Sequence, residues 1–166
     1  SPAVAFFRAM HQAAEGQKKI PILVNGATVD EYDLPAMGDA PAGAISAIQY
    51  VPALPGDFNA RFTKAFSAAF GGDQQPDFMA EAGYDSMTMI DRAVAAQKSP
   101  QLDPDASMRT LRGLSIDSPR GPFRIDAQTR EPVQNIYICR TIMRGGRAVD
   151  VPLETIRSVN ANGVSE

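Results

Sequence analysis

A short, unbroken run of apolar residues near the start of the chain most limits what the chain can fold into. The run covers residues 20–24 (IPILV), and Asn25-Gly26 follows it directly as a turn signal. A strand with one solvent face alternates apolar and polar side chains, whereas an unbroken run fits a strand buried on both faces, as in a parallel sheet covered by helices. The run therefore predicts an α/β fold with parallel sheets flanked by helices.

The segments on either side of this run support the same fold class. Ser1 is a suitable N-cap and Pro2 a suitable first helical residue for an amphipathic helix. After a loop punctuated by Gly38, Pro41 and Gly43, residues 44–51 have the composition of a second strand. The order helix, strand, loop, strand is half of a doubly wound α/β lobe.

The middle of the chain predicts helices. Asp57 is expected to cap an amphipathic helix that carries a phenylalanine stripe, ends at Gly71-Gly72, and packs in the core. A second helix is expected from about residue 77 to 97, with its methionines filling gaps in the core, and a short third over residues 106–111. The apolar positions of the second helix are Met79, Met87, Ile90 and Val94.

From Leu114 onward the pattern changes to strands. Residues 121–126 and 133–143 alternate apolar and polar side chains, and Arg144-Gly145-Gly146-Arg147 is typical of a hairpin turn. Residues 160–166 are expected to form a fraying terminus.

Composition excludes several classes of function. The net charge of −3 and the absence of a Lys/Arg run argue against nucleic-acid binding. No apolar stretch approaches the 18 or so residues of a membrane span. Cys139 is the only cysteine, so no intramolecular disulfide can form.

Catalytic and metal-binding patterns are also missing. His11 is the only histidine, and no nucleophile elbow, P-loop or dinucleotide fingerprint occurs. Asp30, Glu31 and Asp33 can in principle ligate a hard cation, but the glycine and closing glutamate of a calcium loop are absent, so a solvated loop is expected. We therefore predict no enzyme activity, no metal and no cofactor.

Three stretches resemble the branched-chain amino-acid-binding group of type I periplasmic binding proteins of ABC importers. The first joins residues 20–28 (IPILVNGAT) to residues 38–43 (GDAPAG), and the second is residues 82–87 (AGYDSM). The third joins residues 118–126 (SPRGPFRID) to residues 132–138 (PVQNIYI). Whole members are more than twice as long, so the resemblance implies that the chain corresponds to roughly the C-terminal two-fifths of one, trimmed or cut from a longer protein.

The resemblance implies two α/β lobes joined by crossovers, with a ligand in the cleft between them. Residues 1–51 and 132–166 would then belong to the second lobe, and residues 52–131 to the first. The hinge crossovers would lie near residues 51–52 and 130–132, because a few residues there absorb the change in φ and ψ on closure. Arg120, Arg124 and Arg130 are expected to be structural or solvated rather than ligand contacts.

Ligands of open α/β sheets lie outside the carboxyl ends of the strands, which points to three loops. They are the start of the first helix, where free N–H groups suit a carboxylate, the turn after the first strand, and the end of the second strand. The predicted ligand-binding residues are Ser1, Ala3, Asn25, Gly26, Ala27, Thr28, Tyr50 and, less directly, Tyr84. A plain turn at Asn25-Gly26 and an ordinary strand aromatic at Tyr50 are the structural alternatives.

One departure from the family bears on the ligand. Amino-acid-binding members carry an acidic residue in the loop after this strand, and this chain has Gly26 at the matching place. A buried ammonium group without a carboxylate is costly. We therefore expect a small carboxylate- or amide-bearing ligand, such as an aromatic acid, rather than an aliphatic amino acid.

By the resemblance, the chain serves a periplasmic, exported protein, with its signal peptide outside this sequence. Its expected partners are the small ligand, an ABC permease in the membrane, and either the N-terminal part of the same protein or a second copy. Two alternatives remain open: a sensory receptor domain of the same fold, and a fragment of an α/β enzyme whose catalytic residues lie elsewhere.

Overall fold

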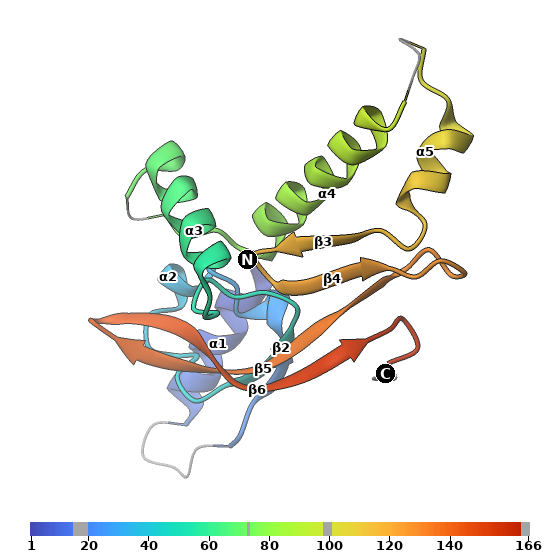
Figure 1. The fold of residues 1–166 in the computed structure, drawn as a ribbon. Helices are drawn as coiled ribbons and strands as arrows, with labels where there is room; N and C mark the ends of the chain where they lie inside the picture. The colour runs from blue at the N-terminus through green and yellow to red at the C-terminus, as the bar shows by residue number, and fades with distance from the viewer. Residues whose placement is uncertain (15–19, 73, 98–100, 164–166) are drawn as a thin grey trace.

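Helices and strands alternate in the first part of the chain, and strands dominate the last (Figure 1). The computed structural model describes residues 1–14, 20–72, 74–97 and 101–163. The elements, in chain order, are α1 (Pro2–Ala13), β1 (Leu23–Asn25), the 3-10 helix η1 (Gly26–Thr28), α2 (Leu34–Met37), β2 (Ile45–Ile48), α3 (Asp57–Phe70), α4 (Phe78–Ala95), α5 (Pro104–Leu111), β3 (Ser115–Ser118), β4 (Gly121–Ile125), β5 (Pro132–Arg144) and β6 (Arg147–Val159).

The strands form one mixed sheet in the order β1-β2-β5-β4-β3, with β6 paired to β5. Strands β1 and β2 are parallel, and every other pair in this order is antiparallel. The α/β class is confirmed, but the parallel part of the sheet is a single strand pair within the described residues. In Figure 1 the long β5–β6 ribbon runs from the end near α1 and α2 to the end near β4.

The hairpin predicted at residues 144–147 is confirmed. Arg144 pairs with Arg147, and β5 and β6 then run antiparallel for almost their whole length. Gly145 and Gly146 have φ values of 58° and 79°. Positive φ at both central residues is what a two-residue turn of the right twist requires, and glycine adopts it without strain.

The apolar run that favoured a doubly buried strand behaves differently from the prediction. Only residues 23–25 form a strand, and the Leu23 side chain is 77% exposed. Ile22 and Val24 pack on the core, so one face of the run is buried as expected. Strand β1 lies at the edge of the sheet and no described element covers its other face, so the prediction of burial on both faces is wrong for Leu23.

Side chains cap the helix at the predicted Ser1 and also at Asp77, near which the sequence predicted a helix start without naming a cap. The Ser1 Oγ accepts a hydrogen bond from the Val4 backbone N–H, and Asp77 Oδ1 accepts one from Ala80 N–H at 2.7 Å. The predicted cap at Asp57 is wrong, because α3 begins after Gly56 and Asp57 lies in its first turn. Gly56 has a φ of 117°, which favours glycine at that position, and Asp57 still suits the positive end of the helix.

The apolar side chains of α3 and α4 are less buried than the sequence predicts. Phe62 packs on the core, whereas Phe70 is 62% exposed. On α4 the expected core positions are exposed, and the buried side carries Glu81, Asp85 and Ala93 instead. The exposed apolar positions of α4 are Met79, Met87, Ile90 and Val94. No described element covers this side of α4, so the prediction of a buried stripe fails there.

Two apolar clusters form the core. One joins α1, α2 and the start of β2 through Phe7, Val29, Leu34, Met37 and Ala44. The other lies where β2 ends and the chain passes to α3; it contains Ile48, Tyr50, Val51, Leu54, Tyr137 and Cys139, with Phe62 and Phe78 packed against it. The second cluster therefore connects β2 and β5 to the helices α3 and α4. Within the described residues, no helix combines the length and apolar character that a membrane crossing needs.

Two glycines differ in how closely the rest of the structure packs against them. A Cβ added at Gly26 would lie 2.4 Å from Ile48 Cβ, whereas one added at Gly83 in α4 would meet nothing within 4 Å. We expect Gly26→Ala to destabilise the fold by about 1–3 kcal/mol through overpacking. The matched Gly83→Ala should stabilise it by about 0.5–1 kcal/mol, because alanine favours the helix. Urea denaturation of both variants measures this, and equal stabilities would contradict it.

Candidate functional site

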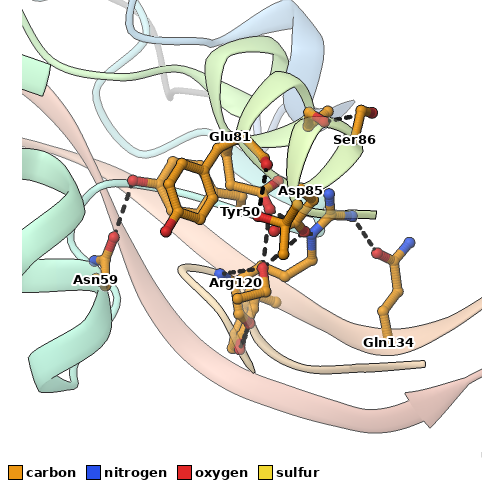
Figure 2. A network of polar contacts seen from close by, with 12 residues as sticks. Tyr50, Asn59, Glu81, Asp85, Ser86, Arg120 and Gln134 are labelled. Carbon is orange, nitrogen blue, oxygen red and sulfur yellow. Dashed lines mark hydrogen bonds and ion pairs between the residues drawn. The ribbon is translucent and has the colours of Figure 1, made fainter. Parts of the chain in front are cut away.

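A buried network of charged side chains joins α4 to the turn between β3 and β4 (Figure 2). The Arg120 Nε lies 2.6 Å from Glu81 Oε1 and 3.0 Å from Asp85 Oδ2. The Ser118 Oγ is within hydrogen-bond distance of the same two oxygens, at 3.1 and 2.8 Å. All four residues are buried, with Glu81 fully inaccessible to solvent.

The network contains two carboxyl groups and a single guanidinium. Burial, together with the neighbouring Asp85, raises the pKa of Glu81 to about 8, and Arg120 opposes the rise. Glu81 Oε2 and Asp85 Oδ1 have no hydrogen-bond partner among the described residues. A buried surplus negative charge is costly. The environment of Glu81 therefore favours its protonated form more than water does.

Sequence reasoning missed the two acidic members of this network. Arg120 was expected to be structural or solvated, and it is structural. Glu81 and Asp85 are four residues apart on one helix, which places both on the same face. That spacing was the available signal, but only the tertiary structure shows that this face of α4 points inward.

The predicted residues at the start of α1 and in the turn after β1 lie around the first core cluster. Ala3 packs against the cluster that contains Val29, the residue directly after η1. The Ser1 hydroxyl donates to Asp33 Oδ2, at the start of α2. The structure thus brings Ser1 and Ala3 to the same end of the fold as η1, and both Ser1 and Asn25 are solvent exposed.

The turn after β1 is closed by its own side chain. Asn25 Oδ1 accepts from the Ala27 N–H at 2.9 Å, so the plain turn considered for Asn25-Gly26 is present. Gly26 is buried against Ile48, Ala27 is exposed and Thr28 is half-buried. In the described part of the chain the Thr28 hydroxyl has no hydrogen-bond partner.

Tyr50 is separate from these loops. Its ring is fully buried and packs edge-on against Phe62 with a centroid distance of 6.1 Å. Its hydroxyl donates to Asn59 Oδ1 at 3.0 Å, as Figure 2 shows, and Asn59 Nδ2 in turn donates to the Pro52 and Leu54 carbonyls. Burial raises the pKa of Tyr50. In this structure Tyr50 ties the end of β2 to α3 and offers no accessible surface.

Of the predicted residues, Tyr84 lines a sizeable cavity. The cavity has a volume of about 830 Å³ and lies between the start of α3, one face of α4, and strands β3 and β4. Tyr84 is 41% exposed and its ring packs against Phe58 and Phe62, at centroid distances of 6.1 and 5.2 Å. Arg92 and Asp117 also line the cavity. The structure therefore separates Tyr84 from the residues at α1 and η1.

The acidic residues after η1 do not assemble a metal site. Asp30 Oδ1 accepts from the backbone N–H groups of Tyr32 and Asp33, both at 3.1 Å, so it closes a turn. Burial raises the pKa of Glu31 to about 8 and that of Asp150 to about 6. Asp150 Oδ1 accepts from the Thr141 hydroxyl at 2.6 Å. Among the residues that the structure describes, no group of three or more potential ligands is arranged for a metal ion.

Comparison with known proteins identifies the class of protein that this fold defines. The sequence model described as "Periplasmic binding protein" matches residues 1–147. The chain belongs to this periplasmic binding protein family, and the resemblance found in the sequence is confirmed.

Three individual proteins of known class are similar to this chain. The Leu/Ile/Val-binding protein homolog 6 of Brucella abortus is 29% identical over 119 residues, which are 72% of this chain and 30% of that protein. Two solute-binding proteins of ABC transporters from Rhodopseudomonas palustris strains BisB5 and HaA2 are 30% and 27% identical, with TM-scores of 0.84 and 0.85. They were solved with 3,4-dihydroxybenzoic acid and p-hydroxybenzoic acid.

The matches cover most of this chain but less than half of each relative. The two Rhodopseudomonas matches cover 94% and 95% of this chain but 42% of each solved chain. The chain therefore spans less than a third of the curated relative and about two-fifths of the solved structures. The type I periplasmic-binding-protein fold of these structures is confirmed for the portion that this chain represents.

The buried carboxyl pair makes stability depend on pH. The pKa of Glu81 lies above its ordinary value of 4.5, so the folded state keeps a proton that the unfolded chain releases. Stability should therefore fall as the pH rises from about 5 to about 8. Glu81→Gln removes this titration and should flatten the fall, measured by urea denaturation at several pH values.

The control for this prediction is Glu154→Gln, which changes an exposed carboxylate on β6. The stability of the Glu154→Gln variant should depend on pH as strongly as that of the unchanged protein. Some slope should remain in Glu81→Gln, because Glu31 and Asp150 also have raised pKa values. A wild-type slope in Glu81→Gln would contradict the assignment of the proton to the Glu81–Asp85 pair.

Proposed function

We propose that the protein containing this chain captures a small aromatic carboxylate in the periplasm and delivers it to the permease of an ABC importer. The observation that carries the proposal is the similarity to two solute-binding proteins whose bound ligands are hydroxylated benzoic acids, at TM-scores of 0.84 and 0.85. The role is capture and release, since binding to an open form and closure around the ligand are sufficient for transport to begin.

The packing at Gly26 supports an aromatic acid, rather than an amino acid, as the ligand. Family members that bind amino acids place an acidic side chain at this position. Here any side chain would collide with Ile48, whose three nearest atoms lie 2.4 to 2.9 Å from an added Cβ. This loop position therefore cannot supply a carboxylate for a ligand ammonium group, and an uncompensated buried ammonium is costly.

The proposed contacts from this part of the protein come from α1 and η1. At the start of the 12-residue helix α1, Pro2 has no N–H and the Val4 N–H is bonded to Ser1, so the proposed donor to a carboxylate is the Ala3 N–H. The Asn25 side chain uses its oxygen to close the turn, which leaves its amide N–H groups for the ligand, and the Thr28 hydroxyl is a further donor. Ser1, Ala3, Gly26 and Ala27 would shape the same surface, and Tyr50 would act indirectly through its position beside the crossover.

The proposed lobes follow the way β5 changes partners. Residues 132–134 of β5 pair with β4 and residues 137–140 pair with β2. We assign residues 1–51 and 132–166 to one lobe and residues 52–131 to the other, with crossovers near residues 51–52 and 130–132. In Figure 1, α1 and α2 lie beside one end of the β5–β6 ribbon, and β3, β4 and α5 lie toward its other end, in support of this division.

The remaining partner is a further stretch of polypeptide. The exposed apolar positions of α4 face away from the described core, and the solved relatives have more than twice the length of this chain. We infer that an N-terminal portion of the same protein covers this face of α4. A second copy of the chain is the alternative occupant.

Ligand screening tests the proposed function directly. The protein expressed from its complete open reading frame should be stabilised by benzoate, 4-hydroxybenzoate or 3,4-dihydroxybenzoate, because a ligand at 100 times its Kd adds roughly 2.7 kcal/mol. That corresponds to an increase in Tm of several degrees in a thermal-shift assay. Leucine and valine serve as matched ligands; stabilisation by them and not by the aromatic acids would overturn the proposal.

Thr28→Val tests the site. The substitution keeps the shape of the side chain and removes the hydroxyl proposed to bind the ligand, so the Kd of the aromatic acid should rise about three- to tenfold. Isothermal titration calorimetry measures the change. The control is Thr110→Val on α5, whose hydroxyl donates to the Ala106 carbonyl of the same helix, and which should leave the Kd unchanged. An unchanged Kd in Thr28→Val would remove this residue from the site.

A further inference from the structure

The β5–β6 ribbon is irregular at the point where β5 passes from β4 to β2. The register between the two strands shifts between Gln134 and Ile136. On the facing strand Ser158 has a φ of 52°, in the left-handed region, and its N–H is bonded to the Asn135 side chain at 3.3 Å. Such a bulge bends a strand pair locally. The bend lies between the two proposed lobes.

Arg120 contacts β5 on both sides of this bulge. Its Nη1 donates to Gln134 Oε1, on the side that pairs with β4. Its backbone carbonyl accepts a hydrogen bond of 2.5 Å from the Tyr137 hydroxyl, on the side that pairs with Ile48 of β2. A single residue in the β3–β4 turn thus connects the two parts of the bent strand.

The position of Arg120 is itself fixed by α4. Its guanidinium is 7% exposed and lies against the Glu81 and Asp85 carboxyl groups, as Figure 2 shows. Its backbone N–H also donates to the Ser118 hydroxyl at 3.2 Å. A charged side chain held in this way cannot move without breaking a buried ion pair, which is strongly destabilising. Arg120 therefore relates the direction of α4 to both parts of β5.

We propose that Arg120 is a positioning residue that fixes the angle between the two lobes at the β5–β6 bulge, and so sets how readily the protein adopts the conformation that binds ligand. It touches no ligand in this role. The effect on affinity rests on the proposed capture function, whereas the effect on the lobe angle does not. A ligand that needs one arrangement of the lobes binds less tightly when that arrangement is a smaller fraction of the population.

Two substitutions break the contacts separately while leaving the Arg120 ion pairs in place. Tyr137→Phe removes the hydroxyl that donates to the Arg120 carbonyl, and Gln134→Leu removes the acceptor for the Arg120 guanidinium. Ser86→Ala on α4 is the matched control, since its hydroxyl bonds only to the Ala82 carbonyl one turn away in the same helix. It loses one hydrogen bond without altering a contact to β5.

The experiment measures the distance between the lobes in the full-length protein without ligand. Spin labels at Gln12→Cys on α1 and Lys64→Cys on α3 report it by pulsed electron paramagnetic resonance, since both positions are exposed. Cys139 is buried and burial raises the pKa of its thiol to about 12, so it does not compete for the label. Both test variants should broaden the distance distribution relative to Ser86→Ala, and a distribution equal to the control in either one overturns the proposal.

A second readout links the angle to binding. In both test variants the Kd of the aromatic acid should rise about three- to tenfold, with Ser86→Ala unchanged. If no aromatic acid binds the wild-type protein, the proposed function fails while the distance measurement still decides the role of Arg120. Broader distances together with an unchanged Kd would also count against Arg120 as a determinant of binding. Urea denaturation of each variant confirms that it is folded.

Discussion

The ion pairs between Arg120 and the two carboxyl groups of α4 are the contacts on which the rest of this structure depends. They place charges in the interior, where each partner alone would be costly, so Glu81 and Asp85 can remain buried only while the guanidinium stays between them. The arrangement fixes α4 against the β3–β4 turn. It also makes the buried side of α4 polar, which is the reverse of what the helix's apolar pattern indicates.

Arg120, held in place by these ion pairs, also contacts β5. The same arginine contacts Gln134, in the part of β5 that pairs with β4, and Tyr137, in the part that pairs with β2. One residue therefore stabilises the positions of both parts of the strand. Tyr50 and its partner Asn59 add a second connection, between the end of β2 and α3. On the proposed division into two lobes, these contacts span the crossover, and the proposed effect on affinity comes from the lobe angle rather than from contact with the ligand.

Much of the local structure was predictable because its causes are local. The Ser1 cap, the start of α4 near Asp77 and the Gly145-Gly146 turn depend on side chains and φ values within a few residues, and all three were predicted from the sequence. The predictions that failed depend on contacts with distant residues. Leu23 is exposed because β1 ends the sheet, and the apolar side of α4 is exposed because no described element covers it.

The sequence by itself determined the α/β class, the family, and the departure at Gly26 that favours an acid as the ligand, since these are written in periodicity, motif order and residue identity. Only the tertiary structure decided that Gly26 has no room for any side chain, that Tyr50 is a buried support, and that Arg120 joins α4 to β5. The physical reason is that the burial of a charge or a ring depends on segments far apart in the chain, and its cost or benefit exists only once those segments meet.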